Sequence, residues 1–464
     1  MLAVSSGFTK QKSPRIVVVG AGLAGLTAAY RLHQKDIDVQ VYEARGRVGG
    51  RILTAILGGN AVELGGSNIN DGAEAVNIRR LIEECRLELT EGRVTLGLDY
   101  FNGEKLISER HLHEGEFDPE IFRVQLADAV KKSRNMREVL GAILEESDPL
   151  YKSLSVRLAA YEGDSPEKLS TINAETLNQM LLGGLSFAHK KSGMEGNYAN
   201  FARIRGGNAL LLERLAGSLG NRVHLNMPLK SVSKSIDGSY NLAFRDGERV
   251  KADILLLAIP CSVYADIHFE EDLIPELRLE TIQSVHYGVN SKILIPFPRT
   301  SSKRISIVND RTVCFFDVSL DALILYYTGD AARFSAETIV ENYWRDRQML
   351  EKEFGEECPP FIAPKVALDE SFVAYDGPVG YSWPNDTYAK GSYAYISPGQ
   401  EVSLTATVQD HGETVKTLFA PIDQTLYFAG EHASVLKDVS GTLEAACESG
   451  ERAARMIKKS LKGL

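Results

Sequence analysis

The chain of 464 residues is poor in cysteine, and its cysteines are not spaced for a disulfide framework or a metal site. There are five, without Cys-x-x-Cys pairs: Cys85, Cys261, Cys314, Cys358 and Cys447. An odd, scattered set is typical of reduced thiols in a cytoplasm rather than of a secreted, cross-linked domain. We therefore expect free cysteines, a cytoplasmic location and no metal.

Long apolar runs and basic clusters are also missing. No stretch of about 18 apolar residues occurs, and residues 1–14 lack the apolar core of a signal peptide. The formal net charge is −10, whereas a nucleic-acid footprint needs clustered positive charge. We expect no membrane span and no nucleic-acid partner, and we interpret residues 1–14 as a flexible N-terminal extension.

What the chain does contain is a globular composition, with 44% apolar and 25% charged residues. A chain of this length is too long for one core of ordinary size, so we expect two domains. A homo-oligomer is compatible with this composition.

The N-terminal region has the pattern of a strand–helix–strand unit. Residues 15–20 are a β-branched run, residues 24–32 are rich in helix formers, and residues 39–43 form a second strand. Such a unit closes with a right-handed crossover and places its strands side by side in a parallel sheet.

A glycine-rich turn joins the first strand to the helix. Gly20, Gly22 and Gly25 form the pattern G-x-G-x-x-G, with Ala24 inside it. These glycines allow a tight turn, close approach of the backbone to a pyrophosphate and close packing of helix on strand. The helix N-terminus adds a positive dipole end that attracts phosphate. The pattern predicts a dinucleotide site; the alternative is a purely structural turn.

An acidic residue and a second glycine pair follow. Glu43 stands 18 residues after Gly25, at the end of the second strand, where its carboxylate can accept both ribose hydroxyls. Residues 44–51 then combine arginines with Gly49 and Gly50, and residues 63–67 add another glycine pair. Arginines beside such turns suggest charge meeting phosphate. The alternative is two glycine turns beside surface arginines.

The remainder of the chain alternates between helical and strand patterns. Residues 76–200 show helical spacing with few strand signals. We expect a helix over 208–219, then an antiparallel meander over 229–236, 240–245 and 250–259 joined by Asp-Gly turns. Further strands are expected over 292–295, 313–318, 322–328 and 426–429, and further helices over 336–354 and 442–459.

These patterns predict an α/β protein whose Rossmann-type signals are interrupted by two insertions. Segments 15–78, 203–280 and 391–460 would build one nucleotide-binding domain from three discontinuous pieces. Segments 79–202 and 281–390 would build a mixed α+β substrate-binding domain that includes a helical insertion.

Several motifs together resemble the flavin-containing amine oxidase family, which includes monoamine, polyamine and L-amino-acid oxidases. The resemblance runs essentially end to end. It is carried by Glu43-Ala44-Arg45 through Gly50-Arg51, Gly65-Gly66-Ser67, Arg205-Gly206-Gly207, Ala258-Ile259-Pro260, Gly391-Ser392-Tyr393, Tyr427 through His432, Gly441 through Ala446 and Glu448 through Ala454.

This resemblance implies FAD as the cofactor and assigns residues to its parts. The turn of Gly20, Gly22, Ala24 and Gly25 would take the pyrophosphate, and Glu43, Ala44 and Arg45 the adenosine ribose. Gly50 and Arg51 would lie beside the flavin end, and Gly65, Gly66 and Ser67 would also contact the cofactor. Val232 would meet adenine through its backbone, and Gly430 and Glu431 the pyrophosphate–ribityl region. Thr442 and Leu443 begin the last helix, whose N-terminus would face flavin C2=O and N1, where reduction places negative charge.

Three further residues match the reacting end of the family's site. Lys292 matches the lysine that bonds through water to flavin N5, although a lysine leading such a strand could instead reach solvent. Trp383 and Tyr393 resemble aromatic residues beside the flavin, although buried aromatics are often only core. An aromatic, water-poor wall favours the neutral amine, which must form before hydride can leave.

Three departures from the family pattern restrict the substrate and the cofactor linkage. Ser392 stands where animal monoamine oxidases carry the cysteine bonded to FAD, so the FAD should be non-covalent. Thr442 replaces the second aromatic of a flavin-facing pair. No arginine follows Gly65-Gly66-Ser67 to clamp a carboxylate, which disfavours amino acids. Asp71 or Glu74 could attract a distant ammonium, or could simply be surface carboxylates.

The resemblance implies oxidation of a small-molecule amine by hydride transfer to flavin N5. The imine would hydrolyse to an aldehyde or ketone, and O2 would leave as hydrogen peroxide. The alternatives are an L-amino-acid oxidase, a desaturase-type flavoenzyme, and a non-catalytic flavin-binding sensor or scaffold.

Overall fold

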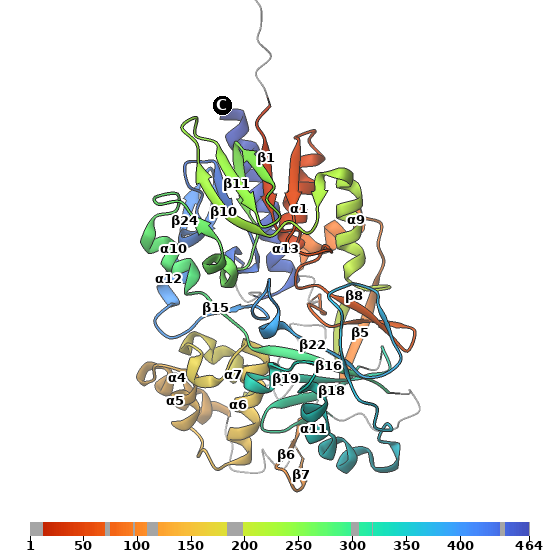
Figure 1. The fold of residues 1–464 in the computed structure, drawn as a ribbon. Helices are drawn as coiled ribbons and strands as arrows, with labels where there is room; N and C mark the ends of the chain where they lie inside the picture. Colours follow the sequence, from red (N-terminus) through yellow and green to blue (C-terminus); the bar gives the residue numbers. More distant parts are fainter. Residues whose placement is uncertain are drawn as a thin grey trace, which may run out of the picture.

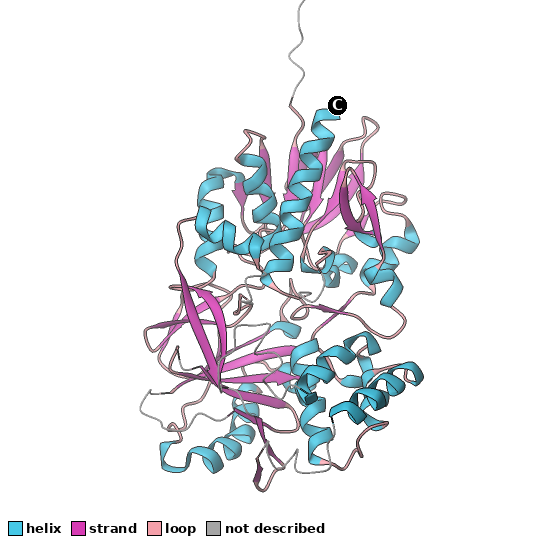
Figure 2. Cartoon of the chain, turned by 180° about the vertical axis from the view of Figure 1, so that it is seen from behind, coloured by secondary structure: helices cyan, strands magenta, loops and turns pink. Residues whose placement is uncertain are grey.

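The computed structural model describes residues 13–69, 75–95, 98–108, 119–182, 198–297, 306–317, 319–436 and 441–463. Its elements form two groups, one above the other in Figure 1. The upper group contains a parallel sheet, and the lower group contains a larger sheet with helices beside it, as the view from behind in Figure 2 also shows.

A five-stranded parallel sheet forms the centre of the upper group, in the order β26, β13, β1, β2, β9. Its strands are β1 (Ile16–Val19), β2 (Val39–Tyr42), β9 (Val223–His224), β13 (Ile254–Leu257) and β26 (Leu426–Phe428). Every residue of β1 and β13 is buried, as expected of strands covered on both faces. The expected strand–helix–strand unit over residues 15–43 is confirmed.

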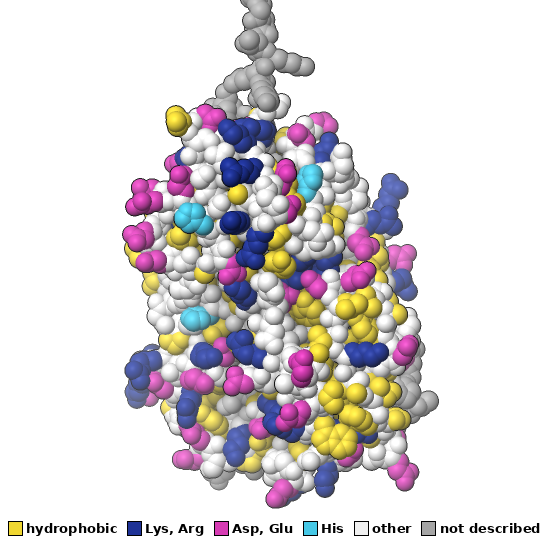
Figure 3. All heavy atoms as spheres, viewed as in Figure 1, with side chains coloured by type: hydrophobic (Ala, Val, Ile, Leu, Met, Phe, Trp, Pro, Cys, Tyr) yellow, Lys and Arg dark blue, Asp and Glu magenta, His cyan; other side chains and the backbone are white. Residues whose placement is uncertain are grey.

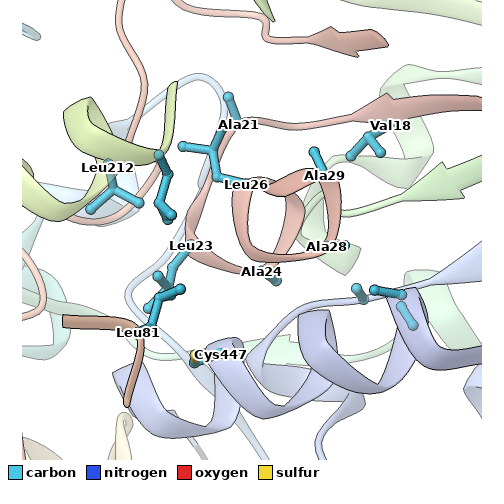
Figure 4. Packing of buried hydrophobic residues seen from close by; sticks show 14 of the residues in the cluster. Val18, Ala21, Leu23, Ala24, Leu26, Ala28, Ala29, Leu81, Leu212 and Cys447 are labelled. Carbon is cyan, nitrogen blue, oxygen red and sulfur yellow. The ribbon is translucent and has the colours of Figure 1, made fainter. Parts of the chain in front are cut away.

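Helix α1 (Leu23–His33) packs on this sheet. Helices α9 (Ala209–Leu219) and α13 (Leu443–Gly463) pack on α1, and α2 (Val76–Glu84) packs on α13. In the core around α1, Ala24 faces the helix that carries Cys447 (Figure 4). A Cβ added to Gly450 of α13 would lie 2.3 Å from the carbonyl oxygen of Ala24. Because Gly450 has no side chain, α13 can lie in close contact with the backbone of α1 at Ala24.

The expected meander forms, but with a different third strand. Strands β10 (Leu229–Lys234), β11 (Tyr240–Phe244) and β12 (Arg249–Ala252) are antiparallel, and β14 (His268–Phe269) lies along the other edge of β10. The single strand expected over 250–259 is wrong. It divides at Asp253, whose carboxylate accepts hydrogen bonds from Arg15, and β13 then enters the parallel sheet.

The lower group is built on a ten-stranded sheet. Its central strands are β16 (Asn290–Pro296), β18 (Thr312–Asp317), β19 (Ala322–Thr328) and β22 (Val379–Ser382). The first three confirm the strands expected over 292–295, 313–318 and 322–328. Its other strands are β5 (Leu89–Thr95), β6 (Leu98–Phe101), β7 (Leu106–Ile107), β8 (Tyr198–Ile204), β17 (Ser306–Val308) and β20 (Lys365–Val366).

The expectation of few strands between residues 76 and 200 is wrong, because β5, β6 and β7 lie there. β5 pairs with β8, which lies far along the chain, so the sequence around β5 does not show its partner. β6 and β7 form a short local hairpin, and β6 also pairs with the distant β17. The helical spacing itself is confirmed by α4 (Pro119–Lys132), α5 (Met136–Gly141), α6 (Pro149–Glu162) and α7 (Ala174–Leu182).

Further helices and strands complete the described structure. The helices are α10 (Glu276–Gln283), α11 (Ile339–Phe354) and α12 (Glu401–Thr405). The strands are β3 (Thr54–Leu57), β4 (Asn60–Glu63), β15 (His286–Tyr287), β21 (Ala374–Tyr375), β23 (Ala394–Tyr395), β24 (Thr407–Asp410) and β25 (Glu413–Lys416). Among the described residues, no helix combines the length and apolarity needed to cross a bilayer.

Charged side chains are distributed over the surface. On the face shown in Figure 3, acidic and basic side chains are interspersed, and no continuous basic surface covers that face. Within the described ranges, no group of His, Cys, Asp or Glu side chains is arranged to hold a metal ion.

Candidate active site

The three glycines of the first turn have different surroundings. A Cβ on Gly20 would lie 2.5 Å from the carbonyl oxygen of Ala258, and one on Gly25 would lie 2.0 Å from that of Gly20. A Cβ on Gly22 would meet nothing within 4 Å. Two glycines are therefore required by packing, whereas Gly22, at the N-terminus of α1, faces open space.

Glu43 is hydrogen-bonded to the backbone of this turn. Its buried carboxylate accepts hydrogen bonds from the backbone N–H of Ala21 (2.7 Å) and of Arg45 (3.0 Å). Burial raises the pKa of Glu43, and these two hydrogen bonds oppose that rise. Each oxygen keeps a further lone pair, so the carboxylate can still accept ribose hydroxyls.

The second glycine pair lies against the first turn. Gly49 forms a parallel bridge with Gly22, and its N–H donates to the carbonyl of Ala21 (2.9 Å). A Cβ on Gly50, which has φ of 57°, would lie 3.3 Å from the Cα of Gly22. Two glycine backbones therefore meet, as a ligand-cradling loop requires.

The arginines between these turns have carboxylate partners. Arg45 is buried and pairs with Asp369 (2.6 Å) and Asp386 (2.5 Å). Arg47 pairs with Asp369 (2.7 Å) and donates to the carbonyls of Val48, Gly50 and Ile52. Their side chains tie the loop to the segments that follow β20 and β22.

Arg51 meets Glu431 at the start of the C-terminal motif. Its guanidinium donates to the Glu431 carboxylate (2.9 Å) and to the carbonyl of Ser392 (3.0 Å), and lies over the ring of Tyr287. Burial would raise the pKa of Glu431, but Arg51 holds it below its ordinary value. The second carboxylate oxygen, Oε2, is buried without a hydrogen-bond partner in the described structure.

His432 continues this polar cluster. Its Nδ1 lies 3.1 Å from the hydroxyl of Tyr287, which also accepts the N–H of Cys261 (3.0 Å). Its Nε2 is buried and, among the described residues, has no partner. Burial lowers the pKa of His432 to about 4, so the ring is neutral near pH 7.

Lys292 reaches the glycine segment at residues 63–67 from strand β16. Its Nζ donates to the carbonyls of Gly65 (2.7 Å) and Glu63 (3.2 Å) and to Oγ of Ser67 (3.2 Å). The side chain is buried rather than directed to solvent. Burial lowers the pKa of Lys292 to about 8, although the charge of Glu63 raises it.

Trp383 meets the same glycine segment. Its buried indole donates to the carbonyl of Leu64 (2.9 Å), and a Cβ on Gly65 would lie 2.9 Å from its ring. Lys292, Trp383 and the predicted flavin-facing glycines are therefore brought together by the structure.

Tyr393 lies beside the N-terminus of α13. A Cβ on Gly441 would lie 3.1 Å from its ring, and its hydroxyl donates to the carbonyls of Ala160 and Tyr161 at the end of α6 (both 3.0 Å). Burial raises the pKa of Tyr393 well above its ordinary value. The ring is therefore held between the last helix and the helical insertion.

The N-terminus of α13 also contacts the glycine segment. Thr442 caps the helix by accepting the N–H of Ala445 (3.2 Å). A Cβ on Gly66 would lie 3.0 Å from the side chain of Leu443. The start of α13 and the segment at 63–67 are thus packed closely against each other.

Val232 lies within β10 between two neighbouring strands, and its carbonyl accepts a backbone hydrogen bond from the loop after β14 (3.0 Å). The backbone N–H of Met227 donates to the carbonyl of Glu43 (2.7 Å), and that of Asn226 to the carbonyl of Arg45 (2.8 Å). The turn before β10 therefore adjoins Glu43 and Arg45, the predicted ribose end.

Sequence reasoning gave no role to three residues that organise this site: Glu63, Asp386 and Tyr287. A carboxylate directly before Leu64-Gly65-Gly66 was a usable signal for Glu63, whereas Asp386 and Tyr287 have no local signature. Asp71 and Glu74 lie outside the described residues.

The residues present fit a flavin dinucleotide. The open space at Gly22 and the paired glycine backbones match a pyrophosphate, and the unpartnered Oε2 of Glu431 matches an acceptor for a ligand hydroxyl.

Comparisons with known proteins also indicate a flavin-containing protein. The family model for flavin containing amine oxidoreductases matches residues 23–458. The chain is 27% identical to lysine-specific histone demethylase 1 homolog 2 of Oryza sativa subsp. japonica, over 95% of this chain but 56% of that protein. It is 26% identical to an L-amino-acid oxidase of Demansia vestigiata, over 98% of this chain and 89% of that protein. It is 24% identical to a probable flavin-containing monoamine oxidase A of Dictyostelium discoideum, over 96% and 98%.

Solved structures show the same fold. Cyclohexylamine oxidase from Brevibacterium oxydans IH-35A superposes with a TM-score of 0.73 at 20% identity, over 97% of this chain and 100% of that chain. A putrescine oxidase variant redesigned in its cofactor binding gives a TM-score of 0.73 at 18% identity, over 96% and 99%.

Proposed function

The chain belongs to the flavin-containing amine oxidoreductase family, and from that premise we propose that it oxidises a small-molecule amine with non-covalent FAD and O2. The observation that carries the proposal is the meeting of Lys292, Trp383 and Leu443 on the glycine segment 63–67. A lysine, an aromatic wall and a helix N-terminus converge there from three distant parts of the chain.

We assign the cofactor to a path that runs from Glu43 to this segment. Glu43 would hold the adenosine ribose, and Gly22 with Gly50 would cradle the pyrophosphate. Arg51 and Glu431 would hold the ribityl region. Ser392 can form no thioether, and its hydroxyl donates to Asn290 (3.0 Å), so the cofactor would be dissociable. Segments 15–78, 203–280 and 391–460 would form the FAD-binding domain, and segments 79–202 and 281–390 the substrate-binding domain.

The chemistry supplied by bound FAD would be acceptance of a hydride from the amine's α-carbon at N5 and transfer of the electrons to O2, leaving an imine that hydrolyses and hydrogen peroxide. Lys292 would hold a proton, or a water, beside the reacting atoms. Its pKa of about 8 allows either charge state near neutral pH.

The aromatic residues would prepare the amine. Trp383 and Tyr393 exclude water from the site, and a water-poor wall favours the neutral amine that can release hydride. The N-terminus of α13 at Thr442 and Leu443 would stabilise negative charge that develops at the end of the cofactor facing it.

The test is the flavin absorbance of the purified protein, recorded anaerobically while pooled amines are added at mildly alkaline pH. Bleaching that reverses on admitting air, with hydrogen peroxide formed, is the expected result. A yellow protein that no amine bleaches would contradict the proposal. Acid precipitation should release the flavin into the supernatant, which checks the non-covalent linkage.

An L-amino-acid oxidase is the second candidate, because relatives of that name match this chain along its length. Recognition of a carboxylate needs a cation with spare charge. Buried Arg203 is matched by Asp317, its ion-pair partner, so it offers none. Bleaching by pooled amino acids but not by amines would favour this candidate.

A further inference from the structure

The side chain of Glu63 is a buried carboxylate at the end of β4 with a fixed set of donors. One oxygen accepts the backbone N–H of Asn208 (2.7 Å), and both accept the hydroxyl of Thr54 (3.0 and 3.1 Å). Thr54 in turn accepts the N–H of Ala209 at the start of α9 (3.1 Å). Gly207 has φ of 113°, and a Cβ there would lie 2.4 Å from Thr54, so the glycine is required for this approach.

Lys292 is hydrogen-bonded to the main chain of the same residue. Its Nζ donates to the main-chain carbonyl of Glu63 (3.2 Å) and to that of Gly65 (2.7 Å). Glu63 therefore joins the glycine segment, the start of α9 and the lysine of the large sheet.

Among the residues that the structure describes, the other titratable groups around Lys292 leave Glu63 as its countercharge. Arg203 on β8 and Asp317 on β18 form a buried ion pair with each other, so their charges cancel. Tyr326 on β19 and Tyr381 on β22 stand opposite Lys292 in the sheet register. Burial raises the pKa of both phenols, so they are neutral.

We propose that Glu63 is the positioning residue that holds the charge on Lys292, and that the two groups titrate as one coupled pair. Where the proposed function holds, the pH dependence of the step served by Lys292 then belongs to this pair rather than to the lysine alone.

The sign of the effect follows from Coulomb attraction. An ionised Glu63 favours the charged form of Lys292, and a protonated Glu63 does not. Burial raises the pKa of Glu63 to about 7 and lowers that of Lys292 to about 8. Two interacting groups that titrate so close together lose their protons in two steps that both groups share.

The direct measurement is an NMR titration of lysine side chains in holoprotein labelled at the ε-carbon with ¹³C. The Lys292 resonance is assigned by its absence in Lys292→Met. In Glu63→Gln we expect its titration midpoint to move down by about one pH unit. The pH midpoint for reaction of the reduced enzyme with O2 should move in the same direction.

Glu444→Gln is the matched control. Glu444 is also buried and also accepts hydrogen bonds from the start of a helix, at Asn77 and Ile78, but it is not bonded to Lys292. In this variant the Lys292 midpoint should stay at the wild-type value. An unchanged midpoint in a Glu63→Gln protein that retains its circular dichroism and its flavin would overturn the proposal.

A variant that fails to fold does not remove the test. In the wild-type protein the Lys292 resonance should show two inflections, one of them following Glu63, and a single-step curve would overturn the proposal. The titration needs no substrate. A protein that no amine reduces, but whose Lys292 follows Glu63, would refute the proposed function and leave this inference standing.

Discussion

The side-chain amine of Lys292 lies 2.7 Å from the carbonyl oxygen of Gly65. This hydrogen bond connects the large sheet of the lower group to the glycine segment 63–67, which packs against the start of α13. The residue proposed to serve the reacting atoms is thus fixed by the backbone of the residues proposed to cradle the cofactor.

Replacing Lys292 by methionine should slow the reaction of the reduced enzyme with O2 by about 10²-fold, because no group would hold a proton at that position. Stopped-flow mixing of the reduced enzyme with oxygenated buffer measures the rate. Lys234→Met, at the partly exposed partner of Asp423, should leave the rate unchanged. An unaltered oxygen rate in Lys292→Met would remove the lysine from the mechanism.

Gly22→Ala should weaken FAD binding without unfolding the chain. Gly22 has φ of −73°, which alanine adopts freely, and its Cβ would fill the open space proposed for the pyrophosphate. We expect a loss of affinity of at least roughly tenfold, about 1.4 kcal/mol, measured by titrating apoprotein with FAD. Gly217→Ala, in the interior of α9 with open space around it, should bind FAD normally. Wild-type affinity in Gly22→Ala would move the pyrophosphate elsewhere.

Asp386→Asn should strongly destabilise the fold, because Arg45 would keep a buried charge with one partially exposed partner, Asp369. Removal of one member of a buried pair costs about 3–5 kcal/mol. Urea unfolding measures this loss. The exposed pair of Lys390 with Asp266 supplies the comparison, since Asp266→Asn should cost at most about 1 kcal/mol. Equal losses in the two variants would show that burial of the Arg45 pair has no energetic consequence.

His432 should make the protein sensitive to acid. Its pKa is about 4 in the fold because burial disfavours the charged ring, whereas an unfolded chain has a histidine pKa of about 6.5. The contribution of neutral His432 to the free energy of unfolding is therefore fully present above about pH 6.5. It is lost as the pH drops toward 4, which lowers the free energy of unfolding by up to about 3 kcal/mol. His432→Gln should lose this dependence. Urea midpoints at pH 7.5 and pH 5 measure it, and an equal pH dependence in both proteins would contradict the assignment.

Local patterns allowed prediction of much of the upper group. The strand–helix–strand unit, the helix over 208–219 and the final helix each depend on their own residues and were predicted. Strand β5 was missed, because its identity depends on pairing with β8 rather than on its own sequence. The division of the meander at Asp253 was missed for a similar reason, since its partner Arg15 is far away in the chain.

The residues of the site also divide into those that local sequence could predict and those that it could not. The glycine turns could be located because glycine spacing reflects local backbone geometry. The partners of Arg45 could not, because Asp369 and Asp386 lie more than 300 residues away and carry no motif. Arginine beside a phosphate-type loop favoured a ligand contact, and only the three-dimensional structure shows that its charge is already matched.

The order of strands in the parallel sheet has a consequence for biosynthesis. Strand β26 and helix α13 come from residues 426–463, yet they border β13 and α1. A nascent chain can form the strand–helix–strand unit early, but the sheet gains its last strand only when these residues leave the ribosome. The cofactor site, which needs the start of α13, would therefore be assembled only after residues 426–463 have been translated, and flavin capture would follow their emergence.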